Sequence, residues 1–229
     1  MGSTVFNQKA RDYALYRPQY ACEAIGALID IVGLDSAFHV ADIASGTGNV
    51  SSHLVDKVSQ VFAVEPEEAM RNQAELLLNK YSSFRSVEAT AEKTTLLDNS
   101  IDLITIGQAF HWIDWAEAQR EFKRILKPDS WIALLWNQYE TTPDMEIDFI
   151  FKPGTQSRHS YPVILEEGWT EFIGGIRSAS RNPSPGDEGY EEFEEKLRKR
   201  FDSQSKGGRI TVEYTTELAV GRLNQRTGK

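Results

Sequence analysis

Short apolar runs alternate with amphipathic segments between residues 38 and 138, and this alternation constrains the fold more than any other feature. The apolar runs are too short for helices and are bounded by turn residues, so they predict buried strands. Between them, apolar residues recur at helical spacing, as in Val50, Leu54 and Val58. Strands that are apolar on both faces must be covered on both faces. The sequence therefore predicts an α/β fold with a doubly wound, mostly parallel sheet.

The expected elements follow one another closely in this region. Strands are predicted at 38–44, 61–66, 84–90, 101–110 and 131–138, and helices at 21–32, 49–58, 67–81 and 114–128. Asp114 predicts a capped start for the last of these helices, and Pro128 marks its expected end.

The remainder of the chain has a different pattern. Residues 187–201 predict a helix in which acidic side chains come first and basic ones last. Residues 209–220 alternate between apolar and polar side chains, which predicts an antiparallel strand. Residues 139–186 combine prolines with scattered apolar residues, and no element is predicted there.

Composition limits the partners of this chain. It has 34 acidic and 25 basic residues, a formal net charge of −9, so we expect no nucleic-acid partner. Cys22 is the only cysteine, which rules out a disulfide or a cysteine-based zinc site within the sequence. No stretch resembles a signal peptide or approaches the roughly 18 apolar residues of a membrane span. We expect a cytoplasmic protein with no membrane partner and leave its oligomeric state open.

Residues that follow the predicted strands should converge in space. The carboxyl ends of parallel strands meet at one edge of the sheet, and ligands bind there at the point where the strand order reverses. The segments concerned are SGTG (45–48), EPEE (65–68), TAE (90–92), GQAFHW (107–112) and NQ (137–138).

The glycine-rich segment is informative together with Glu65. Gly46 and Gly48 allow a ligand close to the backbone, although such a segment alone is equally consistent with a plain turn. Glu65, after the second strand, can accept both hydroxyls of a ribose. A dinucleotide site has a third glycine, which this chain lacks at 49–51. A ligand with one ribose and an amino-acid tail, such as S-adenosylmethionine (SAM), therefore fits better than a dinucleotide.

Five motifs occur in order: YALYRPQY (13–20), DIASGTG (42–48), VEPEEAM (64–70), AEKTTLL (91–97) and GQAFHW (107–112). With them, residues 6–138 resemble the class I SAM-dependent methyltransferases of small molecules, and more narrowly the trans-aconitate methyltransferase-like enzymes. EYTTEL (213–218) is similar to the last strand of that family.

The resemblance implies a Rossmann-like sheet of seven strands in a single domain over residues 1–229. Its parts would be an N-terminal helical cover (1–35), a SAM-binding core (36–138), an irregular substrate-cover insertion (139–186), and a final helix and antiparallel strand (187–229).

The resemblance also implies cofactor contacts at particular positions. The methionine part of SAM would lie against Asp42, Ala44, Ser45, Gly46 and Gly48. The ribose and adenine would lie against Glu65, Pro66, Met70, Ala91 and Glu92, while Gln108 and Ala109 would face the sulfonium. Tyr16 and Arg17 would cover the site, with Arg17 able to pair with the SAM carboxylate. Ordinary packing of an N-terminal helix is the alternative for the tyrosines in this region.

His111 is the candidate catalytic residue. It follows the fourth strand, and the ordinary pKa of a histidine suits a general base. The alternative is that His111 and Trp112 form a pocket wall. No histidine pair has metal-ligand spacing with acids nearby, so we expect no metal.

Two positions depart from the family pattern. Ala44 stands where the family has its first glycine, and we expect the turn to survive if Ala44 has a negative φ. KPDS (127–130) replaces K-P-G-G, so that turn should differ.

The sequence favours a SAM-dependent methyltransferase acting on a small-molecule acceptor, for which a carboxylate is one candidate. Its products would be the methylated acceptor and S-adenosylhomocysteine (SAH). A SAM-binding protein without catalysis and a dinucleotide-dependent oxidoreductase remain as alternatives.

Overall fold

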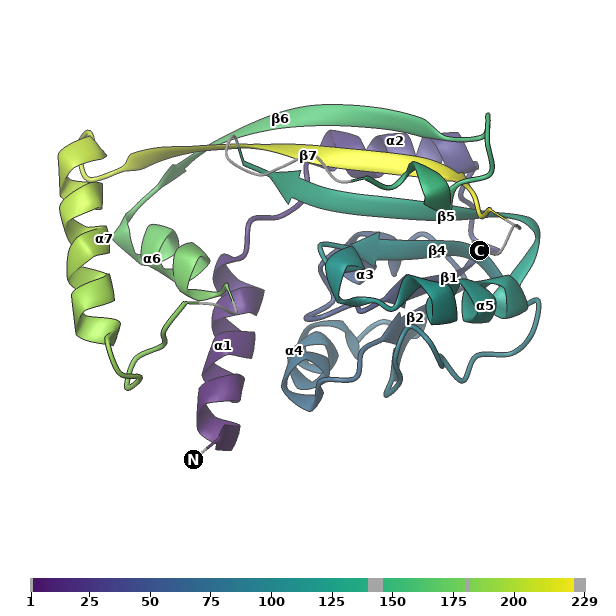
Figure 1. Cartoon of the computed structure of the whole chain (residues 1–229), viewed down its shortest axis with the longest axis horizontal. Helices are drawn as coiled ribbons and strands as arrows, with labels where there is room; N and C mark the ends of the chain where they lie inside the picture. The colour runs from purple at the N-terminus through teal and green to yellow at the C-terminus, as the bar shows by residue number, and fades with distance from the viewer. Residues whose placement is uncertain (1, 140–145, 180–181, 225–229) are drawn as a thin grey trace. The chain divides into compact units, whose positions relative to one another are not determined.

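The computed structural model describes residues 2–139, 146–179 and 182–224, with the backbone alone for residues 2–8. Seven strands of these residues form one mixed sheet. The strand order is β3-β2-β1-β4-β5-β7-β6 (Figure 1). The five parallel strands are β1 (His39–Ile43), β2 (Gln60–Val64), β3 (Phe84–Val87), β4 (Ile101–Gly107) and β5 (Leu126–Gln138). β7 (Ile210–Arg222) runs antiparallel to β5, and β6 (Ser157–Glu167) is the edge strand. The predicted mostly parallel α/β sheet is confirmed.

The four helices of the predicted alternation, α2 to α5, are present with shorter bounds, and α7 is shifted by three residues from the predicted 187–201. They are α1 (Gly2–Tyr16), α2 (Cys22–Val32), α3 (Asn49–Leu54), α4 (Glu68–Leu78), α5 (Trp115–Ile125), α6 (Trp169–Arg177) and α7 (Tyr190–Gln204), with 3-10 turns η1 (Phe110–Trp112) and η2 (Asp148–Ile150). Asp114 caps α5 as predicted, because its side chain accepts from the backbone N–H groups of Ala116 and Glu117.

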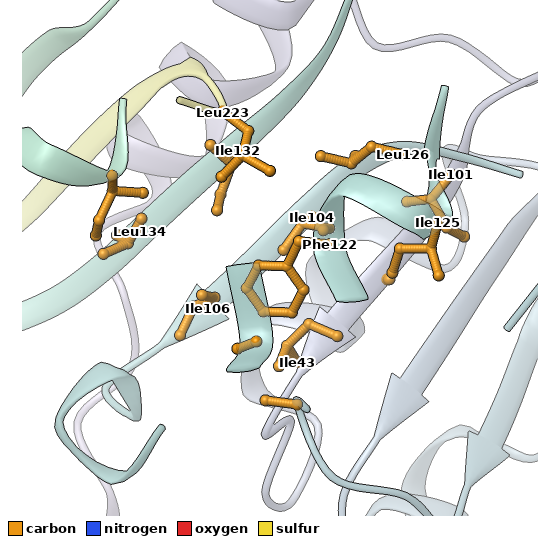
Figure 2. Close-up of a cluster of buried hydrophobic side chains, with 14 of the residues drawn as sticks. Ile43, Ile101, Ile104, Ile106, Phe122, Ile125, Leu126, Ile132, Leu134 and Leu223 are labelled. Carbon is orange, nitrogen blue, oxygen red and sulfur yellow. The ribbon is translucent and has the colours of Figure 1, made fainter. Parts of the chain in front are cut away.

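One face of the sheet packs against α5. Figure 2 shows Phe122 of this helix lying among Ile43, Ile104 and Ile106, which come from β1 and β4. Phe122 is completely buried. The alternate residues of the same strands turn to the opposite face, where Leu103 packs with residues of α2, α3 and α4. Helices on both faces explain why these strands are apolar throughout.

The chain divides into two compact units. Unit 1 comprises 1–19 and 162–214, and unit 2 comprises 20–161 and 215–229. Unit 2 contains β1 to β5 and the residues of β7 that pair with β5. Unit 1 has its own small core, in which Phe172, Phe201 and Ile210 are buried.

The segment 139–186 is more regular than expected, since its described residues include β6 and α6. Along β6, half-buried and exposed residues alternate, and Pro162 takes an exposed position, which an edge strand tolerates. Residues 140–145 and 180–181 of the expected insertion lie outside the described residues.

The predicted helix end at Pro128 and strand start at 131 are wrong. Helix α5 ends at Ile125, and β5 begins directly at Leu126. The pairing with β4 then shifts between Ile101 and Leu103, which leaves residues 127–130 in an irregular bulge. Asp129 has φ 55 there, in the stretch where the family has glycines.

Candidate cofactor site

The strand order reverses between β1 and β4, which are neighbours and run parallel. Their carboxyl ends lie together, because Ile43 pairs in register with Ile106. The glycine-rich loop follows β1, and the GQAFHW motif follows β4. This is the edge of a doubly wound sheet where a ligand site is expected.

Both strand ends carry a non-glycine residue with a left-handed backbone. Ala44 has φ 51 and Gln108 has φ 57. Ala44 therefore does not have the negative φ under which we expect the turn to survive. A left-handed conformation costs an L-residue roughly 1–2 kcal/mol, and such strain clusters at ligand sites. The loop is held nonetheless, because the Ser45 N–H donates to the Val64 carbonyl at 3.1 Å.

The two loop glycines have different surroundings. A Cβ built on Gly46, which has φ 58, meets no other atom within 4 Å, so this glycine borders open space. A Cβ on Gly48 would lie 2.7 Å from Leu78 Cδ1 of α4. Gly46 thus leaves room beside the loop, whereas Gly48 allows α4 to pack against it.

Two buried polar atoms of this loop have no hydrogen-bond partner among the described residues. They are Ser45 Oγ and Asn49 Oδ1. Buried polar atoms are nearly always satisfied, so an unsatisfied pair in one loop is a feature that a bound polar ligand would explain.

Asp42 is 1% exposed and faces the interior of the fold. One carboxylate oxygen accepts from the Ser51 N–H at 3.0 Å and from Ser51 Oγ at 2.6 Å, and the other accepts from Thr105 Oγ1 at 2.9 Å. Burial outweighs these hydrogen bonds and raises the pKa of Asp42 to about 6. Asp42 thus ties β1 to β4 and to the start of α3 beneath the loop.

Glu65 joins the ends of β1 and β2. Its Oε2 accepts from the Gly46 N–H and its Oε1 from the Glu67 N–H, both at 2.9 Å. Burial raises the pKa of this carboxyl, although both backbone hydrogen bonds oppose the shift. Each carboxylate oxygen has a second acceptor position for a ligand hydroxyl.

Sequence reasoning missed Arg71, which supports Glu65 from α4. Its Nη1 donates to the carbonyl of Glu65 at 3.0 Å and to that of Pro66 at 2.6 Å. Its Nη2 lies 3.1 Å from a carboxylate oxygen of Glu88. Arg71 is buried, and no local feature of the sequence marks it, because an arginine near the start of a helix is usually exposed.

The residues predicted near adenine lie on the adjacent loops. Met70 is half-buried in the first turn of α4, and Pro66 is exposed after β2. Ala91 is buried in a turn, where Thr90 and Lys93 form a β-bridge. Glu92 accepts from the Asp114 N–H at 3.0 Å, which connects this turn to the start of α5.

The GQAFHW segment turns sharply after β4. Gln108 Nε2 donates to the Asn137 carbonyl at 3.3 Å, and Ala109 precedes the 3-10 turn η1. Within η1, His111 and Trp112 are exposed, with ring centroids 5.0 Å apart. His111 therefore lies at the edge of the sheet where the strands β1 and β4 end. Its role as a general base stays a prediction.

Tyr16 and Arg17 belong to unit 1, whereas the other predicted site residues belong to unit 2. Tyr16 packs against Gly174 of α6, and the Arg17 guanidinium lies 5.3 Å from the centroid of the Tyr13 ring. The proposed cover over the cofactor stays a prediction.

Among the described residues, no group of three or more His, Cys, Asp or Glu side chains is arranged to hold a metal ion. In the same part of the chain, every helix is too short or too polar to cross a membrane.

Comparison with known proteins gives one consistent result. Residues 41–134 match a family model described as a methyltransferase domain. An uncharacterized methyltransferase of Mycobacterium tuberculosis is 34% identical over 135 residues, which are 59% of this chain and 53% of the relative. An uncharacterized methyltransferase-like protein of Schizosaccharomyces pombe is 26% identical over 171 residues, 74% of this chain and 65% of the relative. The fold matches a SAM-dependent methyltransferase of Geobacter sulfurreducens, solved in complex with SAH, with a TM-score of 0.58 at 15% identity over 96% of this chain and 98% of that chain.

In sheet order, matched domain and fold, the chain is similar to the class I SAM-dependent methyltransferases. Residues 41–134 are similar to methyltransferase domains, and the Geobacter sulfurreducens structure of the same fold holds SAH. The predicted fold is confirmed, and the comparisons agree with the predicted class and cofactor. The narrower resemblance to trans-aconitate methyltransferases stays a prediction. The chain spans about half the length of the first curated relatives it matches.

Proposed function

We propose that this chain binds SAM at the carboxyl ends of β1, β2 and β4 and transfers its methyl group to a small-molecule acceptor. One observation carries the proposal: adjoining loops of the segment that matches a methyltransferase domain combine open space with polar groups that can accept hydrogen bonds. These features are the open side of Gly46, the unsatisfied Ser45 Oγ and Asn49 Oδ1, and the Glu65 carboxylate.

The residues present fit the cofactor. Ser45 Oγ and Asn49 Oδ1 would satisfy polar groups of its amino-acid tail, and Glu65 would accept from the ribose hydroxyls. Asp42 would support the loop without contacting the cofactor, because both of its carboxylate oxygens already accept hydrogen bonds inside the fold. Arg71 would keep Glu65 in place from α4.

Catalysis in this site depends on alignment. When bound, SAM supplies an activated methyl group, so that an acceptor lone pair forms the new bond to carbon while the electrons of the carbon–sulfur bond stay on the sulfur of SAH. The protein's part is to hold the two reactants in line and exclude water. An acceptor that carries a proton on its nucleophilic atom also needs a base, and we propose His111 for that role.

Calorimetric titration with SAH tests the cofactor site. We expect wild-type protein to bind SAH and Glu65→Gln to bind it about 10–100-fold more weakly, the range for losing hydrogen bonds to a charged group. Glu68→Gln is the matched control, because Glu68 is an exposed neighbour, and it should bind as the wild type does. Absence of SAH binding at millimolar concentration contradicts the proposal, and binding of NADH in its place supports an oxidoreductase.

Labelled SAM with a panel of metabolites tests turnover, with trans-aconitate included as a carboxylate acceptor. We expect His111→Ala to abolish methyl transfer to any acceptor that must lose a proton, while leaving the SAH dissociation constant unchanged. Equal losses of turnover and SAH binding would instead indicate a packing role for His111. SAH binding without transfer to any acceptor would favour the binding protein without catalysis.

A further inference from the structure

The surface beside the cofactor site carries an exposed tryptophan. Trp112 is 72% exposed, although large aromatic side chains are usually mostly buried. It lies in η1, four residues after the strained Gln108 at the end of β4. Exposed aromatic side chains of this kind are enriched where ligands and partners bind.

The turn that carries Trp112 is well anchored. The Trp112 N–H donates to the Ala109 carbonyl at 2.9 Å. The ring of Phe110 lies 5.6 Å from that of Trp115, and Trp115 lies 5.9 Å from the buried Phe122. Phe110 thus fixes the turn to the core, so that Trp112 is presented on a rigid support. A rigid aromatic surface loses little conformational entropy on binding.

The charge at this edge of the sheet is negative. In unit 2, the segments at the carboxyl ends of the strands (44–48, 65–68, 88–93, 107–114 and 137–139) contain six carboxylates and a single lysine. The carboxylates are Glu65, Glu67, Glu68, Glu88, Glu92 and Asp114, and the lysine is Lys93. The nearby Arg71 is already paired with Glu88. Such an edge attracts a sulfonium cation and repels an anionic acceptor.

We propose that Trp112 determines acceptor specificity, and that the acceptor is a flat apolar or aromatic molecule without net negative charge, which stacks on the Trp112 ring. The inference rests on the proposed function and names the substrate class of that same site. It disfavours the carboxylate acceptor that the sequence left as a candidate.

The experiment compares two probes with the same ring system, neutral 2-naphthol and anionic 2-naphthoate, titrated calorimetrically into the full chain saturated with SAH. We expect 2-naphthol to bind the wild type and to bind Trp112→Ala at least about tenfold more weakly, as for a truncated aromatic anchor. Trp112→Phe should retain most of the affinity. We expect 2-naphthoate to bind the wild type more weakly than 2-naphthol, with a difference that shrinks as salt is added.

Leu97→Ala is the matched control, because Leu97 is 78% exposed but precedes β4 and so lies toward the opposite edge of the sheet. It should bind 2-naphthol as the wild type does. Equal 2-naphthol affinity in wild type and Trp112→Ala, or tighter binding of 2-naphthoate or trans-aconitate than of 2-naphthol, overturns the inference. If SAH binds normally in those cases, the proposed function stands, whereas failure of the wild type to bind SAH overturns both.

Discussion

Two residues at the switch point, Ala44 and Gln108, show how tertiary packing at the candidate site can override local backbone preference. Both have positive φ, where an alanine or a glutamine is disfavoured relative to glycine. At Ala44 the loop still closes, because the Ser45 N–H and the Glu65 carboxylate hold the residues on its far side. The strain is local, so its cost should be measurable by a single substitution.

Ala44→Gly should stabilise the protein by about 0.5–1 kcal/mol, because relief of left-handed strain exceeds the extra backbone entropy of glycine. Ala41→Gly is the control in β1, where the backbone is extended and the side chain is buried. That substitution should destabilise the protein by at least about 1 kcal/mol. Urea unfolding gives both values, and a less stable Ala44→Gly would show that the loop is not strained.

Asp42 should titrate far above an ordinary aspartate, with a pKa of about 6 in place of 3.8. Because its folded-state pKa is raised, its contribution to stability is fully present below about pH 4 and is lost as the pH rises through 6. Carbon NMR of the side-chain carboxyl measures the midpoint directly. Thr105→Val removes a hydrogen bond that lowers this pKa, so the midpoint should move higher. A midpoint near 4 would contradict the interior position of Asp42.

At the scale of elements, the sequence predicts the strands that are buried on both faces and misses the strand that is half-exposed. β1, β2 and β4 are continuous apolar runs because helices cover both sides of them, and their positions were predicted within a few residues. β6 was missed, because an edge strand with one half-buried face needs no strong apolar pattern and tolerates Pro162.

The candidate site also has residues that the sequence predicts and residues that it does not. The glycine loop and Glu65 were predictable, since their positions follow from the strand ends. The partners of Asp42 and the support from Arg71 were not, because Ser51, Thr105 and Arg71 reach them through tertiary packing that carries no local signature.

Substitution by alanine should mainly reduce stability at Gly48 and mainly weaken SAH binding at Gly46. Gly48→Ala brings Cβ against Leu78 of α4 and keeps φ 82, so it should cost about 2–4 kcal/mol of stability. Gly46→Ala meets no atom, so it should cost only about 1–2 kcal/mol but weaken SAH binding at least about tenfold. Urea unfolding and calorimetry separate the two effects, and unchanged SAH affinity in Gly46→Ala would place the ligand elsewhere.

At the scale of the whole molecule, the two units differ in the size of their cores. Unit 2 contains extensive apolar clusters on both faces of the parallel strands. Unit 1 has a cluster with three buried residues, Phe172, Phe201 and Ile210. Less buried apolar surface means a lower free energy of local opening.

Hydrogen exchange should therefore be faster in α6 and α7 than in β1 and β4 at matched conditions. Phe201→Ala should speed exchange in unit 1 while leaving β1 and β4 protected, whereas Phe122→Ala should cost about 3–5 kcal/mol and expose unit 2. Equal exchange in both units, or a global effect of Phe201→Ala, would indicate one cooperative unit.

The late position of β7 also matters while the chain is being synthesised. β5 lies inside the sheet, yet its partner on one side comes much later, as the hydrogen bond between Asn137 and Thr216 joins residues 79 positions apart. At about 5–20 residues per second, a ribosome needs about 4–16 s to make that stretch. For that time the apolar β5, with Ile132 and Leu134, is an unpaired edge that can associate with other nascent chains. A chain that stops short of β7 keeps this edge of β5 unpaired permanently. The first effect of losing β7 should therefore be aggregation of the chain in the cell.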